Sequence, residues 1–429
     1  MYRTLVILAL MCASLQAQVT GASIATTAAT SVAGSAPSVN PVIEWNKTLL
    51  VIVRTAGAQP STIHSTRSFA ILHAAIFDAV NNINGSFAPY LVHLTDVSPR
   101  ASQPAAADQA AHDVLVSLYS TFQSTLDTEL EQDLAQIPDG KNKTDGIAVG
   151  QNVAAQILAF RSNDGSGVNP PPYKTRKEPG FYQLTPPDFS AADFTHWPDV
   201  TPFAIIRPDD FLPGPPPELT SDEYTRVFNE VKSLGEIDSK TRTQEQTLIG
   251  QFWNGKIQNY WNEIAQTAAS AQNLNLENSA RLFALLNISL ADSTIAFFEA
   301  KYVYQTWRPV TAVQKAGTDG NPKTRPDHDW LPLTTKTAPD PSYPGAHSAI
   351  SFAGAEVLKS ILGDRFTFDV TSESLQRVKR HFTSFSAAAQ EAGLSRIYAG
   401  QHFRTDHMAG TGLGTKVAES IVDTILLPK

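Results

Sequence analysis

The chain has 429 residues, 42% of them hydrophobic, and a formal charge of −8 at pH 7. This length can bury a large core in one big domain or in two closely packed ones. The acidic balance argues against a nucleic acid or an anionic membrane surface as partner, because both select for clustered Lys and Arg. We therefore expect a small solute as the ligand.

Residues 1–17 have the pattern of a cleaved secretory signal. One arginine precedes an apolar run, Leu5–Leu15, and the small residue Ala17 follows it. The run is shorter than the ~20 residues that a membrane span needs, which favours cleavage over anchoring. The only cysteine of the chain, Cys12, lies in this segment, so the mature protein has no disulfide. We expect a secreted or periplasmic protein without a membrane span after signal removal.

Residues 18–40 are small and polar without apolar periodicity, and they predict a flexible lead-in. A folded domain is expected over residues 41–429. Its first segment, "STRSFAILHAAIFDAVNNI", places apolar residues three and four positions apart and thus predicts a helix with one apolar face. Similar faces follow at 105–121, 123–136 and 145–160.

Two stretches rich in proline, 162–219 and 317–344, interrupt the helical pattern, since proline blocks helix interiors. The first predicts a long crossover that lies over the helices, and a capping-box pattern from Thr220 to Glu223 predicts the start of the next helix. Further helices are expected at about 221–233, 239–253, 257–272, 276–305, 346–362, 371–391 and 404–425. With no long alternating pattern, the chain is predicted to be all-α, with two packed units resembling four-helix bundles.

The C-terminal half, residues 275–429, contains charged residues in apolar settings. In "KYVYQTWRP", Lys301 ends an apolar helix and Arg308 follows seven positions later. Seven residues are about two helical turns, so both side chains can project from nearly the same face if the helix continues. The alternative is two ordinary surface charges.

The second charged stretch is "PSYPGAHSAISFAGAEVL". Pro344 and Gly345 predict a turn, and a long helix of small residues starts at about Ala346 or His347. The free backbone N–H groups and the positive end of a helix dipole favour an anion there.

The third stretch is "SRIYAGQHFRTDH". His402 and Asp406 are four residues apart, which lets a carboxylate meet an imidazole on one helix face and fix its tautomer. Arg396 offers a planar fork of donors that suits oxyanions, and Gly400 allows close backbone approach.

Four of these side chains could instead bind a cation such as zinc: His347, His402, Asp406 and His407. Against this, Lys301, Arg308 and Arg396 would repel a divalent cation but would stabilise a tetrahedral anion. We therefore favour an oxyanion as the ligand. We expect His407 to have a structural role, because it points to a different face from His402.

The order and spacing of three motifs carry a resemblance: Lys301 with Arg308-Pro309, then Pro344-Gly345-Ala346-His347, then Ser395-Arg396 with His402 and Asp406. This signature resembles that of the vanadium-dependent haloperoxidases and the type 2 phosphatidic-acid-phosphatase-like acid phosphatases, which form one superfamily. The likeness covers most of the chain after residue 41 and is closer to secreted bacterial haloperoxidases. The middle motif departs from the usual Pro-Ser-Gly-His, because Gly345 takes the place of the serine and Ala346 that of the glycine.

The resemblance implies roles for these residues. His402, oriented by Asp406, would bind the vanadium of a vanadate cofactor, and His347 would act as acid and base. The oxyanion would be neutralised by Lys301, Arg308 and Arg396, with backbone N–H groups of Gly345 or Ala346 assisting. The implied activity is the oxidation of halide by hydrogen peroxide to hypohalous acid, in which Lys301 also polarises the bound peroxide.

Two alternatives remain. With phosphate in the same site, the protein would be a secreted acid phosphatase that hydrolyses a phosphate ester, with His402 as the nucleophile of a phosphohistidine intermediate. The length favours the haloperoxidase, because compact acid phosphatases with this signature are generally nearer half as long. The serine missing at Gly345 motivates the second alternative, an inactive relative that only binds anions.

Overall fold

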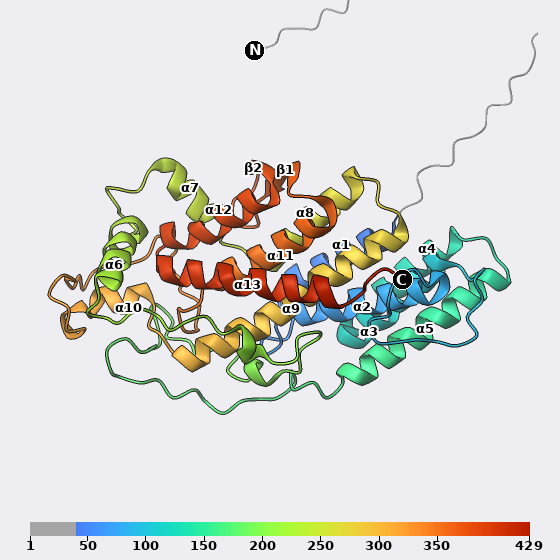
Figure 1. Cartoon of the computed structure of the whole chain (residues 1–429), viewed down its shortest axis with the longest axis horizontal. Coiled ribbons are helices and arrows are strands. Elements are labelled where there is room, and N and C mark those ends of the chain that lie inside the picture. Colours follow the sequence, from blue (N-terminus) through green and yellow to red (C-terminus); the bar gives the residue numbers. More distant parts are fainter. Residues whose placement is uncertain (1–39) are drawn as a thin grey trace, which may run out of the picture. The chain divides into compact units, whose positions relative to one another are not determined.

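The computed structural model describes residues 40–429 (Figure 1). The predicted signal peptide, 1–17, and the predicted lead-in up to residue 39 lie outside the described residues. The described part holds thirteen α-helices and one two-stranded sheet, which confirms the predicted all-α class. The helices are α1 (Pro41–Arg54), α2 (Ser65–Asn84), α3 (Gln103–Leu118), α4 (Gln123–Ala135), α5 (Lys141–Arg161), α6 (Asp222–Gly235), α7 (Gln244–Phe252), α8 (Ile257–Ala271), α9 (Leu276–Tyr304), α10 (Pro309–Gln314), α11 (Ala346–Leu362), α12 (Phe385–Tyr398) and α13 (Arg404–Thr424).

Two helical bundles share the long helix α9. On one side α2, α3 and α5 pack together, with α2 against α9, and on the other side α11, α12 and α13 form a group in which α11 and α13 contact α9 (Figure 1). Helix α9 is buried along most of its length, and most of its buried residues are apolar, as expected for a helix surrounded by protein. It is the one helix of residues 40–429 with the length and hydropathy of a membrane span, and 94% of its most apolar window is buried inside the protein.

Helices α11 and α13 cross at very short range because α13 carries glycines where they meet. A Cβ atom on Gly414 would lie 2.0 Å from the carbonyl oxygen of Ala349, and one on Gly410 would lie 2.3 Å from that of Gly345. Both contacts are with backbone atoms, so a side chain could be accommodated only if the helices moved apart. The glycines thereby bring the second and third motifs together.

The predicted helix over 371–391 is wrong in its first half. There a hairpin forms from β1 (Arg365–Thr371) and β2 (Lys379–Ser384), and α12 begins only at Phe385. The apolar residues of β1 alternate, and Phe368 pairs with Phe382 across the hairpin at a ring distance of 5.9 Å. An alternation of three apolar residues is too short to outweigh the helical pattern that follows it.

The start of α6 also differs from the prediction. Ser221, not Thr220, caps the helix, and its hydroxyl accepts a hydrogen bond from the N–H of Tyr224 at 3.1 Å. A capping box does form at α7, where Thr243 and Gln246 satisfy each other's backbone N–H groups. This cap sets the start of α7 later than the predicted residue 239.

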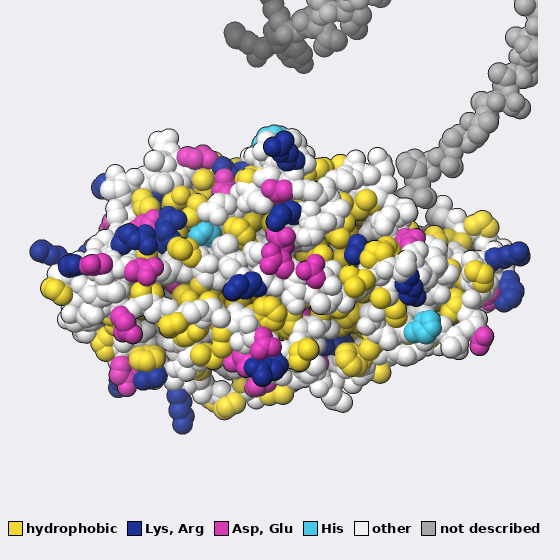
Figure 2. Space-filling view, viewed as in Figure 1, with side chains coloured by type: hydrophobic (Ala, Val, Ile, Leu, Met, Phe, Trp, Pro, Cys, Tyr) yellow, Lys and Arg dark blue, Asp and Glu magenta, His cyan; other side chains and the backbone are white. Residues whose placement is uncertain are grey.

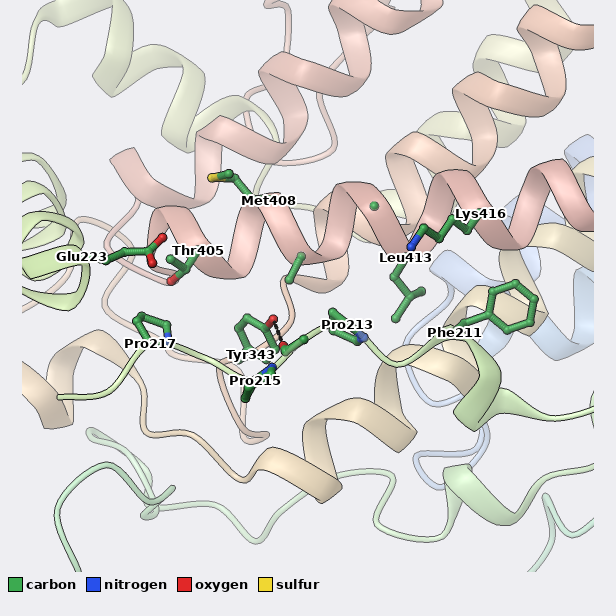
Figure 3. Close-up of a pocket in the computed structure, with 13 residues that line it drawn as sticks. Phe211, Pro213, Pro215, Pro217, Glu223, Tyr343, Thr405, Met408, Leu413 and Lys416 are labelled. Atoms are coloured by element: carbon green, nitrogen blue, oxygen red, sulfur yellow. Dashed lines mark hydrogen bonds between the residues drawn. The ribbon is translucent and has the colours of Figure 1, made fainter. Parts of the chain in front are cut away.

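The predicted crossover over 162–219 lies against the C-terminal helices. Two tyrosine hydroxyls hold it, since Tyr304 donates to the carbonyl of Pro213 and Tyr343 donates to that of Gly214. Figure 3 shows the hollow of about 370 Å³ between this segment and α13, with Met408 and Lys416 on its helical side. None of the predicted site residues lines this hollow.

Acidic and basic side chains are interspersed on the face shown in Figure 2, with apolar side chains between them.

Candidate functional site

One cavity of about 340 Å³ collects most of the predicted site residues. Those that line it are Arg308, Ala346, His347, Arg396 and His402. The other three lie behind this lining: Lys301 contacts the lining residue Asp340, Asp406 contacts His402, and Gly345 directly precedes Ala346. The structure thus brings all three motifs to one place.

Lys301 and Arg308 meet, but not on one helix face as expected. Helix α9 ends at Tyr304, and Gln305 adopts a left-handed conformation with φ of 53° that turns the chain away. Arg308 then precedes α10 and is almost fully buried. The two cations are joined by Asp340, whose Oδ1 lies 2.9 Å from Lys301 Nζ and also accepts from Arg308 Nη2.

His402 and Asp406 also meet by a different route than expected. Helix α13 begins at Arg404, so His402 precedes the helix, and Asp406 reaches back toward the helix start. Asp406 Oδ2 lies 3.1 Å from His402 Nδ1, and it accepts hydrogen bonds from Ser342 Oγ at 2.6 Å and from the N–H of Phe403 at 3.0 Å. Burial raises the pKa of Asp406 to about 6, against the lowering effect of these two donors.

The hydrogen bonds of His402 assign its tautomer. Arg308 Nη1 lies 3.1 Å from His402 Nε2, and a guanidinium can only donate, so Nε2 is the acceptor. Nδ1 then carries the proton and donates it to Asp406. Burial, followed by the charge of Arg308, lowers the pKa of His402 well below 6.5. The ring is therefore neutral, with the lone pair on the nitrogen that can ligate a metal or attack phosphorus.

Arg396 is a buried cation with unused donors. Its Nη1 donates to Asn254 Oδ1 at 3.0 Å, while its Nε has no hydrogen-bond partner within residues 40–429. Burial, and then the neighbouring Arg308, lower the pKa of Arg396 to about 9, so it stays charged at neutral pH. An unpaired buried cation beside a cavity is costly, and an anion in the cavity would remove that cost. The site therefore fits a vanadate- or phosphate-like group.

His347, at the start of α11, is neutral as well. Its Nε2 lies 3.0 Å from the carbonyl oxygen of Trp253, which can only accept, so Nε2 carries the proton. Burial, followed by the charge of Arg396, lowers the pKa of His347 well below 6.5. Nδ1 is then the nitrogen that can take up a proton.

Of the two backbone donors expected at the anion, Gly345 or Ala346, the first is already engaged by the chain. Its N–H donates to the carbonyl oxygen of Asp406 at 2.9 Å, and a Cβ atom at this position would lie 3.2 Å from that oxygen. Ala346, the first residue of α11, lines the cavity and remains the candidate backbone donor.

Sequence reasoning missed Asp340, which pairs with two of the motif cations. Its signal was present, because an aspartate in "PDPSYPGAH" stands directly before the second motif. Asn254 gave no such signal, since it lies 142 positions from Arg396. Only the packing of the α7–α8 loop brings that amide to the site.

The zinc alternative finds no support in the geometry. His407 Nδ1 lies 2.9 Å from Ser348 Oγ and its Nε2 lies 3.4 Å from Gln390, away from His402. In the described part of the chain, no three His, Cys, Asp or Glu side chains come together as ligands of a metal ion.

Comparisons of sequence point the same way. A family model for the second helical-bundle domain of VCPO matches residues 281–426, a span that includes all three motifs. The vanadium chloroperoxidase of Curvularia inaequalis is 24% identical over 490 aligned positions, which cover 86% of this chain and 79% of that protein.

Similar solved structures have the same fold. A bacterial vanadium-dependent iodoperoxidase superposes with a TM-score of 0.75 at 24% identity, over 90% of this chain and 96% of that one. A bacterial vanadium-dependent chloroperoxidase in its holo form has a TM-score of 0.65 at 15% identity, over 91% and 94% of the two chains. The chain is therefore similar in sequence and in fold to vanadium-dependent haloperoxidases, and the three motifs that carry the likeness meet at one cavity.

Proposed function

We propose that this protein is a vanadate-dependent peroxidase that oxidises halide with hydrogen peroxide to hypohalous acid. The observation that carries the proposal is the neutral His402 ring, which lines a cavity together with Arg308 and Arg396 and has its unprotonated Nε2 beside Arg308 Nη1. The names of the relatives support the halide as substrate.

Vanadate would be held at His402 Nε2, with its negative charge balanced by Arg308, Arg396 and, behind them, Lys301. The N–H of Ala346, in the first turn of α11, would add a neutral donor. When bound, vanadate supplies a Lewis acid that activates hydrogen peroxide without a change of oxidation state.

The chain itself supplies orientation and proton transfer. Asp406 holds Nδ1–H of His402 and thereby keeps the lone pair on Nε2. His347, with Nδ1 unprotonated, would hold the proton that hydrogen peroxide loses when it binds. Burial of both rings keeps them neutral, as these roles require.

The test is to assay the purified protein with peroxide and iodide, bromide or chloride, with and without orthovanadate, beside a phosphate-ester assay. We expect halide oxidation only with vanadate, and none in His402→Ala. His328→Ala, in an exposed loop position, is the matched control and should retain full activity. Ester hydrolysis that vanadate inhibits, without halide oxidation, would identify a phosphatase, and inactivity in both assays would identify an anion-binding relative.

We also propose export, which rests on residues 1–17 alone. Expression of the full chain in a host with a secretion pathway should yield a processed protein outside the cytoplasm. Retention of Met1 in a cytoplasmic product, seen by N-terminal sequencing, would contradict this.

A further inference from the structure

The ammonium group of Lys301 has no donor left for a bound anion. A lysine has three N–H donors. In this structure they meet Asp340 Oδ1 at 2.9 Å, the carbonyl of Ser342 at 3.3 Å and the carbonyl of Pro341. Lys301 is fully buried and does not line the cavity, whereas Asp340 does. The carboxylate of Asp340 therefore stands where an anion would have to approach Lys301.

Arg308 is largely occupied as well. Its Nε donates to the backbone carbonyl of Asp340 at 2.8 Å and its Nη2 to the carboxylate of the same residue. Its Nη1 meets the carbonyl of Gln401 and Nε2 of His402, both at 3.1 Å. Four of the five N–H groups of this guanidinium are thus engaged by the chain, two of them by Asp340.

Asp340 is ionised in this setting. Burial raises the pKa of Asp340, but Lys301 and Arg308 outweigh burial and hold it below its ordinary value. Its side chain is only 13% exposed, so its charge is weakly screened. Arg396 has no carboxylate contact, and it is the one of the three motif cations left free to meet a ligand, beside the exposed Lys256, which also lines the cavity. The cavity is therefore less positive than the three motif cations suggest.

We propose that Asp340 is an internal counter-anion that competes with the bound oxyanion for Lys301 and Arg308. It would lower the affinity of the site for oxyanions and disfavour doubly charged ones most, because repulsion from a fixed carboxylate grows with ligand charge. This inference rests on the proposed function for the site's ligand class, but it concerns binding and not turnover.

The experiment measures binding by calorimetric titration of the full chain with inorganic phosphate and, separately, with orthovanadate. Asp340→Asn should bind both at least about tenfold more tightly than the natural protein. The gain with phosphate should be larger at a pH where phosphate is doubly charged. Asp329→Asn removes the same charge from an exposed position of the same loop, and its affinity should stay within about twofold, since screened surface charges contribute little.

Equal or weaker binding by Asp340→Asn, an equal gain in Asp329→Asn, or no binding by either protein would overturn the inference. If Asp340→Asn is destabilised, phosphate should still raise its Tm by more than that of the natural protein, and Asp340→Ser offers a second variant. Tighter binding by Asp340→Asn in a protein without halide oxidation would overturn the proposed function alone. Halide oxidation together with unchanged affinity would overturn this inference alone.

Discussion

Asp406 concentrates three contacts on one oxygen. Its Oδ2 meets Nδ1 of His402, Oγ of Ser342 and the N–H of Phe403. Because the carboxylate selects the tautomer of His402, its loss should weaken ligand binding at Nε2, the other nitrogen of the ring. The residue acts through His402 and does not itself line the cavity that holds the histidine.

We expect Asp406→Asn to lower the affinity for phosphate or orthovanadate by about 10- to 100-fold, as is usual when the partner of a ligating histidine is replaced. Calorimetric titration measures this. Asp423→Asn, at an exposed position near the end of the same helix, is the control and should bind normally. An unchanged affinity in Asp406→Asn would show that the tautomer is set by Arg308 alone.

A second residue, Asp108 on α3, makes stability depend on pH. It is 2% exposed and accepts a hydrogen bond from Trp45 Nε1 at 3.0 Å. Burial, and then the charges of Asp133 and Glu129, raise the pKa of Asp108 from 3.8 to about 7, although the Trp45 bond opposes this. The folded state therefore holds this proton more tightly than the unfolded state, and its contribution to stability falls as pH rises from about 4 to 7.

Asp108→Asn keeps an acceptor for Trp45 but cannot ionise. The variant should exceed the natural protein in free energy of unfolding by about 1–3 kcal/mol at about pH 8, and the two should nearly agree at about pH 4. Urea unfolding at both pH values checks this. If the variant and the natural protein differed in free energy of unfolding by the same amount at both pH values, Asp108 would not titrate in this range.

At the scale of elements, the crossing of α11 and α13 positions the site. The hydrogen bond from Gly345 N–H to the carbonyl of Asp406 spans this crossing, and Gly410 and Gly414 permit it. A methyl group on Gly414 would meet the backbone of Ala349, which cannot give way as a flexible side chain could.

Gly414→Ala should lower the free energy of unfolding by about 1–3 kcal/mol, which is the usual cost of overpacking. Gly412→Ala lies on the same helix with no atom within 4 Å of the added Cβ, and should be neutral or stabilising by up to about 1 kcal/mol. Urea denaturation of both variants decides the matter. An equal change in the free energy of unfolding in both variants would show that helix propensity, and not the close crossing of α11 and α13, determines the effect of the added methyl group.

At the scale of the whole molecule, the cavity joins distant segments. His64 before α2, Lys256 before α8, Arg308 before α10 and Arg396 on α12 all line it. A ligand held there contacts parts of the chain from both bundles. Binding to the folded state alone must then raise the stability of the whole compact unit.

We expect inorganic phosphate at about 100 times its Kd to raise the free energy of unfolding by about 2.7 kcal/mol. Differential scanning calorimetry should show the melting transition moving upward. His402→Ala should lose most of this increase. An equal shift in the variant would mean that phosphate acts through general salt effects and not through this cavity.

Local patterns along the chain were enough to predict most of the helices and the residues of the candidate site. Apolar spacing predicted the helices of both bundles, and the motifs identified Lys301, Arg308, His347, Arg396 and His402, which the fold brings together. Periodicity and motif spacing are properties of short segments, so they can be read without the fold. The hairpin of β1 and β2 was not predicted, because its alternation of apolar and polar residues is too short to be distinguished from the helical pattern that follows.

The hydrogen-bond and ion-pair partners of these groups could be identified only from the folded chain. Asp340 turns toward two cations, Gly345 gives its N–H to Asp406, and Asn254 reaches Arg396 from 142 positions away. Each of these contacts depends on where separate helices and loops pack, since a buried donor or charge takes whichever partner the packing brings within reach. These partners come from segments that are far apart in the sequence, so the spacing of residues along the chain does not predict them.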